Sequence, residues 1–418
     1  MAYLNQQIDQ IVDQAFPHII ERLQSLVSIP TVNPGIDMRP AAAMLGKLAD
    51  ELGYRVEFDE APENIAKEHG MTSGTNVLAT RPHQQRTPSN SGLILNAHFD
   101  TIAPGPGWTV SPYQGVRHKG CIYGRGIMVS KADVIAYLFA HFLAQQIVQP
   151  TIDVTVALTG DEEMGGYVGP KRLLDNGMLQ PNSIAICPGT TDQIVHEHAG
   201  VIQWRIQING RSRHAALLER GEDANQAAAN LITQLYSYRD ILSDGGWLTV
   251  GQMMGGAAAN MVSGQTTIFV DRRIHASELM ENVRDELRTV IAQWTNTTDC
   301  IGTIEEIVAA NPLRSQGSES WINWFRDQAS IALQREVPLV ASSLYTDARH
   351  FAEHGIPTLC YGAGNADLKL FGAHGADEHI LERDLEHALK VLVRVIIELW
   401  EEGPELIDEL RQNRSAVS

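Results

Sequence analysis

The chain has 418 residues, of which 44% are hydrophobic, and a formal net charge of -18. This length exceeds what a single hydrophobic core usually supports, so we expect two domains. The acidic balance argues against nucleic acid and anionic membranes as partners, because both require a basic footprint on the protein.

The cysteines and the first residues indicate the compartment. Cys121, Cys187, Cys300 and Cys360 show no CxxC spacing, which is typical of reduced thiols in a cytosolic protein. The chain begins without the basic segment and apolar stretch of a secretory signal, and no apolar run approaches the length of a membrane span. We therefore predict a cytoplasmic protein that acts on a small molecule or peptide.

The first half of the chain alternates between helical and strand-like patterns. Apolar residues recur at helical spacing from Ile8 to Val27, and Pro30 ends this predicted helix. From there to about residue 200, apolar strand-like runs alternate with helical stretches such as residues 131–146. This alternation predicts an α/β fold with a mostly parallel sheet covered by helices.

The pattern changes between residues 200 and 309. The expected elements are strand 201–208, helix 223–238, strand 247–252, strand 266–271, helix 279–295 and strand 300–307. This β-α-β-β-α-β order resembles a duplicated split β-α-β unit, a compact α+β module whose sheet is antiparallel.

The α/β alternation resumes in the last part of the chain. It contains a late strand at residues 357–361 and a long closing helix at residues 381–400. We therefore predict a discontinuous catalytic domain, residues 1–199 and 310–418, which carries an inserted domain, residues 200–309.

Polar side chains follow two of the predicted strands. His98 and Asp100 come after one apolar run, and the adjacent Glu162 and Glu163 come after another. The carboxyl ends of parallel strands form a ligand crevice, in which one carboxylate can hold a metal while the other moves protons. A lone histidine is more often structural, and an acidic turn can be a solvated loop. Their combination nevertheless predicts a metal hydrolase.

Another candidate ligand, His374, lies in a glycine-lined loop between Gly372 and His379. By itself this segment fits a helix start equally well, with Asp377 near the amino end of the closing helix. The sequence leaves both interpretations open.

Together with Tyr-Gly-Arg-Gly at residues 123–126 and Thr-Asp-Ala-Arg at residues 346–349, these segments resemble the M20 family of metallo-aminopeptidases and deacylases. That family includes acetylornithine deacetylase, succinyl-diaminopimelate desuccinylase and carboxypeptidase G2. The resemblance extends over nearly the whole chain. It implies a catalytic α/β domain around a metal centre and an inserted lid module that commonly mediates dimerisation, so a homodimer is expected.

The resemblance also implies a role for each polar residue of the catalytic domain. His98, Glu163 and His374 correspond to metal ligands. Asp100 corresponds to the carboxylate that orients His98, and Glu162 corresponds to the general base.

In the inserted module, His214 lies in a segment similar to the family's glycine-to-histidine motif. The resemblance implies that His214 reaches a neighbouring subunit's site and stabilises the oxyanion there. Asn260 and Arg273 match substrate-binding positions, and the arginine typically holds a carboxylate. A guanidinium suits that role because it can donate two parallel hydrogen bonds.

Two positions depart from the family pattern. Where the family has an aspartate that bridges two metals, this chain has Val129, and the remaining ligand carboxylate is replaced near Gly189. Neither residue can ligate a cation, so the usual two-metal centre is not expected. His98, Glu163 and His374 remain as a set that can hold one ion with open positions for water or substrate.

Three further residues are candidates to complete such a site: Asp133, His196 and His198. Each of them is more simply explained by a structural position on a helix, a strand or a loop. Two histidines and one glutamate suit zinc, manganese or cobalt.

We therefore predict a metal-dependent hydrolase of a carbon-nitrogen bond, in an amide or N-acyl amino acid that carries a carboxylate, with one ion per chain. Glu162 would take the proton of the attacking water, and His214 and Asn260 would stabilise the oxyanion. Two alternatives stay open. The chain could be a hydrolytic deaminase whose aminobenzoate-like substrate coordinates the metal, or a metal-poor binding or regulatory relative.

Overall fold

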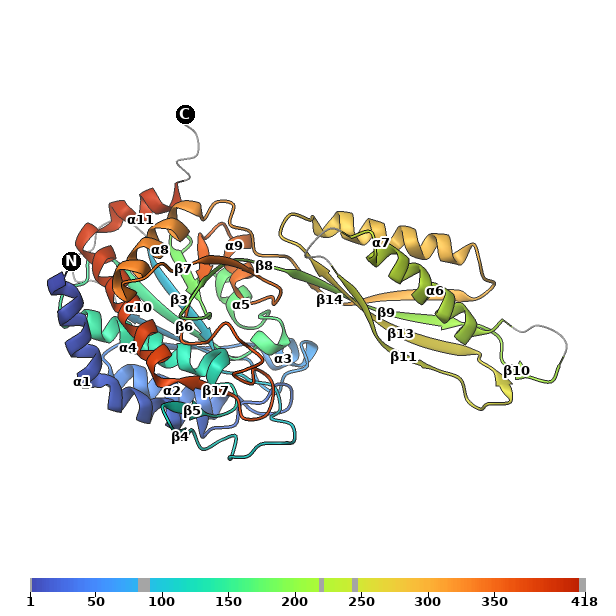
Figure 1. Cartoon of the computed structure of the whole chain (residues 1–418), viewed down its shortest axis with the longest axis horizontal. Coiled ribbons are helices and arrows are strands. Elements are labelled where there is room, and N and C mark those ends of the chain that lie inside the picture. Colours follow the sequence, from blue (N-terminus) through green and yellow to red (C-terminus); the bar gives the residue numbers. More distant parts are fainter. Residues whose placement is uncertain (1, 82–90, 218–221, 243–246, 413–418) are drawn as a thin grey trace. The chain divides into compact units, whose positions relative to one another are not determined.

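The computed structural model describes residues 2–81, 91–217, 222–242 and 247–412 (Figure 1). The chain divides into two compact units, which are described separately. Unit 1 comprises Met1–His196, Ser315–Val340 and Thr346–Ser418, and unit 2 comprises Glu197–Arg314 and Ala341–Tyr345.

The bounds of unit 2 differ from the insertion expected at residues 200–309. Unit 2 is longer at both ends and includes a second short segment, Ala341–Tyr345. The N–H of Ala199 donates a hydrogen bond to the carbonyl of Ser342 (2.8 Å), which ties this segment to unit 2. Such long-range pairing leaves no periodic signal in the sequence.

Unit 1 is built on an eight-stranded sheet with the order β1-β2-β6-β3-β7-β16-β8-β15. In sheet order the strands are Arg55–Glu60, Thr75–Arg81, Asp153–Thr159, Gly92–His98, Ile184–Cys187, Thr358–Cys360, Ile194–His198 and Leu339–Ser342. The central strands β6, β3, β7 and β16 are parallel, whereas β1, β2 and β8 pair antiparallel. Strand β3 is buried at every position, as expected for a parallel strand covered on both faces. The predicted mostly parallel sheet is confirmed.

The helices of unit 1 are α1 (Ala2–Val27), α2 (Arg39–Glu51), α3 (Glu63–Glu68), α4 (Ala132–Ala144), α5 (Pro170–Asp175), α8 (Glu319–Leu333), α9 (Ala348–Glu353), α10 (Glu382–Glu402) and α11 (Pro404–Arg411). Helix α4 packs against α10 and contacts β3 and β6, and α9 contacts β7 and β16. A small sheet is formed by β17 (His379–Leu381), β5 (Cys121–Tyr123) and β4 (Val116–His118), in that order.

Helix α4 is the most buried helix of unit 1. The sequence was expected to contain no apolar run that approaches the length of a membrane span, but Ile127–Ala144 has that length and hydropathy. However, 89% of this stretch is buried inside the fold. It includes a short π-helical turn, Ile127–Lys131, followed by α4, and it is explained as a core helix that the parallel sheet and α10 cover.

Unit 2 is a four-stranded antiparallel sheet with the order β11-β13-β9-β14 and two helices. Its main elements are β9 (Gly200–Asn209), α6 (Ala224–Arg239), β11 (Leu248–Gly255), β13 (Gln265–Ile274), α7 (Met280–Thr295) and β14 (Ile301–Ala310). Alternate residues of β13, such as Ile268 and Val270, are buried in one cluster with residues of α6 and α7. The predicted β-α-β-β-α-β order is therefore confirmed. A short pair, β10 (Arg213–His214) and β12 (Met261–Val262), is added to it.

Candidate active site

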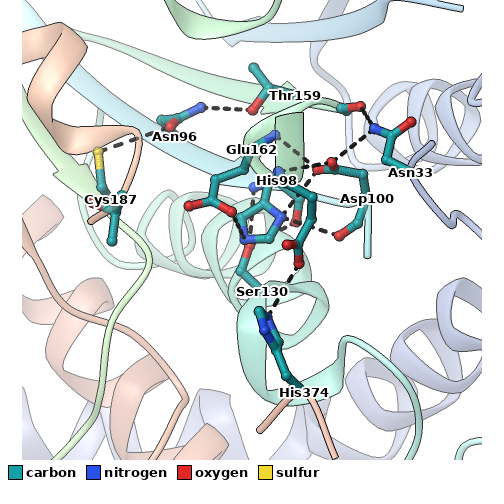
Figure 2. A network of polar contacts seen from close by, with 12 residues as sticks. Asn33, Asn96, His98, Asp100, Ser130, Thr159, Glu162, Cys187 and His374 are labelled. Atoms are coloured by element: carbon teal, nitrogen blue, oxygen red, sulfur yellow. Dashed lines mark hydrogen bonds and ion pairs between the residues drawn. The ribbon is translucent and has the colours of Figure 1, made fainter. Parts of the chain in front are cut away.

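The site lies where the central parallel strands of unit 1 end. His98 is the last residue of β3, and Glu162 follows the neighbouring strand β6. Because parallel strands present their carboxyl ends at the same edge of the sheet, these side chains meet there. Figure 2 shows His98, Asp100 and Glu162 grouped at this edge, with His374 approaching from a separate segment.

Asp100 is the buried centre of this group. Its carboxylate accepts a hydrogen bond from the Asn33 amide (2.9 Å) and from the backbone N–H groups of Glu162 and Glu163 (both 3.2 Å). Nδ1 of His98 lies 3.2 Å from the same carboxylate. Burial opposes the charged form of His98, but Asp100 and the neighbouring glutamates raise its pKa well above the usual value.

Glu162 is the partly buried carboxyl group next to His98. Its Oε2 lies 3.9 Å from Nε2 of His98, and its side chain is 15% exposed. Burial raises the pKa of Glu162 to about 7. The negative charges of Glu163 and Asp100 also raise this pKa, whereas His98 lowers it. A carboxyl with this pKa can act as acid and as base near neutral pH.

Sequence reasoning missed the residues that hold the turn of Glu162. The turn, Glu162–Met164, ends at Gly165, whose carbonyl accepts hydrogen bonds from the Arg349 guanidinium and from Nε2 of His350 (2.9 Å). Asp347 is also buried beside this turn, and burial followed by the charge of Glu162 raises its pKa well above the usual value. The motif at residues 346–349 marked this segment, but no pattern linked it to Gly165.

His374 pairs with Glu163. Nε2 of His374 lies 3.4 Å from Oε1 of Glu163, and the His374 side chain is 53% exposed. The Glu163 carboxylate raises the pKa of His374, although partial burial opposes this effect. The alternative interpretation of this segment as a helix start is wrong, because α10 begins at Glu382 and Asp377 instead accepts hydrogen bonds from Thr109 (2.8 and 2.9 Å).

The two candidate histidines on β8 have separate environments. His196 is half-buried on a strand antiparallel to β16, with the preceding Val195 opposite Cys360, the last residue of β16. The chain at His196 therefore runs away from the carboxyl ends of the parallel strands. His198 is buried, and its Nδ1 lies 3.0 Å from the carbonyl of Ala199.

Unit 2 brings together two of its three candidate residues. His214 and Asn260 are adjacent and exposed, because β10 pairs with β12 and the N–H of Ala215 donates to the carbonyl of Asn260 (2.9 Å). Arg273 lies at the other end of β13, where its Nε donates to Asp271 (2.8 Å).

Comparison with known proteins identifies the family. Residues 94–398 match the family model described as Peptidase family M20/M25/M40. The chain belongs to this family. M20 hydrolases act on carbon-nitrogen amide bonds, so the chain is a hydrolase of that class.

Three relatives illustrate the similarity. An acetylornithine deacetylase from Yersinia pestis is 28% identical over 306 residues, which cover 66% of this chain and 74% of the relative. A succinyl-diaminopimelate desuccinylase from Helicobacter pylori (strain G27) is 24% identical over 404 residues, covering 91% and 99%. The crystal structure of a tripeptidase from Staphylococcus aureus has a TM-score of 0.75 at 19% identity, covering 92% of this chain and 99% of that one, and shows the shared fold.

M20 enzymes are generally dependent on divalent metals. Among the residues that the structure describes, no three His, Cys, Asp or Glu side chains are close enough together to hold a metal ion. His98 faces Glu162, and His374 faces Glu163, as two separate pairs. The donor types nevertheless suit one divalent ion, and the half-exposed His374 is the side chain with most freedom to complete the set.

Val129 and Gly189, where the sequence departs from the expected ligand pattern, are both closely surrounded in the structure. Val129 is half-buried and packs against the hydrophobic core. A Cβ atom added at Gly189 would lie 2.7 Å from the backbone nitrogen of Tyr361 and 2.8 Å from the carbonyl carbon of Cys360. Backbone therefore fills the space that a carboxylate at position 189 would need.

Asp133 holds in place the backbone segment that fills the space next to Gly189. It is fully buried on α4, and its Oδ1 accepts a hydrogen bond from the N–H of Ala363 (2.6 Å). A Cβ at Gly362 would lie 2.0 Å from the same oxygen, so Asp133 packs directly against the segment that crosses Gly189. Burial raises the pKa of Asp133 to about 7, while the N–H of Ala363 opposes that effect.

Restoring the family carboxylates should not restore a second ion. In the Val129→Asp/Gly189→Glu double variant we expect no more bound Mn²⁺ per chain than in the parent, measured by calorimetric titration. Gly189→Ala alone should lower the free energy of unfolding by about 1–3 kcal/mol, because its Cβ overlaps backbone atoms.

Gly251→Ala is the matched control, because a Cβ there has no neighbour within 4 Å. Binding of a second Mn²⁺ per chain in the double variant would contradict this account of position 189. An unchanged free energy of unfolding in Gly189→Ala would contradict it as well.

Proposed function

We propose that this M20 hydrolase cleaves the amide bond of a small substrate that carries a carboxylate, with an N-acyl amino acid as the first candidate. His98, Glu163 and His374 would hold one divalent ion, for which zinc, manganese and cobalt are suitable. When bound, the ion supplies Lewis acidity that polarises the substrate carbonyl and acidifies water.

The environment of Glu162 is the observation that carries this proposal. Its carboxyl group is partly exposed, lies 3.9 Å from Nε2 of His98 and has its pKa raised to about 7, chiefly by burial. Glu162 would take a proton from the attacking water and return it to the leaving nitrogen, which a base with this pKa does efficiently near neutral pH.

Asp100 supports the same role. It is completely buried and accepts hydrogen bonds from the backbone of Glu162 and Glu163. Its contact with Nδ1 of His98 leaves Nε2 directed toward Glu162. One carboxylate thus orients the imidazole and the glutamate turn at the same time.

The inserted unit would supply the contacts to substrate. His214 and Asn260 would donate hydrogen bonds to the developing oxyanion, and Arg273 would bind the substrate carboxylate. Along β13, the stretch from Gln265 to Arg273 extends about 26 Å at the usual rise per residue. His214 pairs with Met261 of β12, which comes just before the Gln265 end of β13, so it lies toward the end of β13 opposite Arg273. This separation favours a homodimer in which His214 serves a second copy.

Two other functions would use the same site. Because backbone atoms leave no room for a carboxylate at position 189, the chain offers fewer ligands to an ion. This favours a substrate that coordinates the ion itself, such as an aminobenzoate-like amine that undergoes hydrolytic deamination. A metal-poor binding protein would also tolerate Val129 and Gly189. The retained pairing of His98, Asp100 and Glu162 supports the enzyme, because a binding protein does not need a positioned base.

Glu162→Gln should lower kcat for hydrolysis of N-acetylated amino acids by about 10²–10⁴-fold, because the substitution removes the general base and keeps the shape. The activity of the parent should be lost with a chelator and return with Mn²⁺ or Zn²⁺. The exposed Glu402→Gln at the end of α10 is the control. Unchanged kcat in Glu162→Gln would refute the role of this residue, and release of ammonia from aminobenzoates alone would favour the deaminase.

The metal content of protein purified without chelators or a metal-affinity tag should be near one equivalent per chain. Glu163→Ala should remove it, since this substitution removes the only carboxylate of the proposed ligand set. Near two equivalents would contradict the single-ion centre. No bound ion, even after addition of Mn²⁺ or Zn²⁺, would favour the binding protein.

Mixing an inactive Glu162→Ala chain with an inactive His214→Ala chain should restore part of the activity. In the mixed dimer, one site would combine an intact Glu162 with an intact His214 from the other chain. Steady-state hydrolysis after subunit exchange is the measurement, with each variant alone as control. If no activity returns, His214 acts within its own chain or not at all.

A further inference from the structure

A buried ion pair, Arg125 with Glu378, joins three connecting segments of unit 1 beside the candidate site. Both side chains are 1% exposed, and Nη1 of Arg125 lies 2.6 Å from Oε2 of Glu378. Arg125 follows β5, whereas Glu378 precedes β17, so the pair links segments that are distant in the chain. The polar groups around the pair show what it holds.

The Glu378 carboxylate holds the segment that leads to Val129. Its Oε2 accepts a hydrogen bond from the N–H of Gly126, and its Oε1 accepts one from the N–H of Met128 (both 3.0 Å). Gly126 has a φ of 75°, in the left-handed region, and a Cβ there would lie 2.1 Å from Cγ2 of Thr101. The carboxylate therefore fixes a backbone that has little room to move.

The Arg125 guanidinium holds the segment that carries His374. Its Nη2 donates to the carbonyl of Gly375 (2.6 Å) and to the carbonyl of Pro104 (3.0 Å), and the guanidinium lies over the ring of Trp108 at 5.2 Å. Gly375 directly follows His374, whose own φ is 58°. A strong, charge-assisted hydrogen bond thus holds Gly375, the residue after His374. The positive φ of His374 is uncommon for a residue other than glycine.

His374 has few other constraints on its side chain. It is 53% exposed, and its nearest charged partner is Glu163 at 3.4 Å. The position of its imidazole is therefore set mainly by its backbone. Because Arg125 and Glu378 form one buried pair, the segments that they hold keep a fixed spacing.

We propose that Arg125 is a positioning residue that acts through His374: its guanidinium, neutralised by Glu378, holds the Gly375 carbonyl and so sets where the imidazole of His374 meets Glu163. This inference rests on the proposed function only where His374 is taken as a metal ligand. The effect on the backbone is independent of that function.

Arg125→Lys is the informative variant, because lysine keeps the charge but cannot bond Glu378, Gly375 and Pro104 together. We expect amide hydrogen exchange to become faster in peptides that span residues 368–379, with unchanged exchange in β3 and α4. The affinity for Mn²⁺, measured by calorimetric titration of the full chain, should fall by about 10–100-fold, which is the usual cost of losing a residue that orients a ligand.

A double-mutant cycle separates positioning from a general structural role. In a His374→Ala background, Arg125→Lys should cause no further loss of Mn²⁺ affinity if it acts through His374. Arg117→Gln is the matched control, because Arg117 forms a bidentate pair with Glu382 (2.6 and 2.7 Å) that is more exposed and joins β4 to the start of α10. It should change neither the exchange of residues 368–379 nor the affinity.

Two results would overturn the proposal. Unchanged exchange of residues 368–379 in Arg125→Lys would show that the guanidinium does not hold this segment. A loss of affinity that adds fully to that of His374→Ala would show that Arg125 acts by another route. If the parent binds neither Mn²⁺ nor Zn²⁺, the proposed function fails, while hydrogen exchange still decides whether Arg125 positions the segment.

Discussion

The carboxylate of Asp100 is the interaction on which the arrangement of the site depends. It is completely buried, and a buried carboxylate is stable only when several donors surround it. Those donors are the Asn33 amide, the His98 imidazole and the backbone N–H groups of Glu162 and Glu163. Because they come from β3, from the turn after β6 and from the segment before α2, one charge fixes three parts of the site relative to each other.

The side chains of the site differ in how firmly they are held. Asp100 holds His98 and the glutamate turn together, and Arg349 and His350 hold the end of that turn at the Gly165 carbonyl. His374 instead comes from a loop, and its side chain is half exposed. Arg125 holds the backbone of that loop at Gly375, so the two parts of the site differ in the freedom of their side chains and not in the freedom of their backbones.

The sequence predicted the parts that depend on local periodicity. The helices and strands of unit 2 were predicted within a few residues, because α6 and α7 have one apolar face and β13 alternates between buried and partly exposed residues. It did not predict contacts between distant segments. Arg125 and Glu378 are separated by 253 positions, and Asp133 and Ala363 by 230, so no spacing connects them. Asp133 was a candidate ligand because its carboxylate is visible in the sequence, whereas its bond to Ala363 is not.

The glycine at position 189 also constrains how this chain could change over evolutionary time. Its missing Cβ leaves room for the backbone of Cys360 and Tyr361, and Asp133 holds the segment that follows. A carboxylate at this position would first require that segment to move, and the move would break a buried hydrogen bond. Substitution of Gly189 by any other residue is therefore expected to destabilise unit 1, so this position excludes side chains of every kind and not only carboxylates.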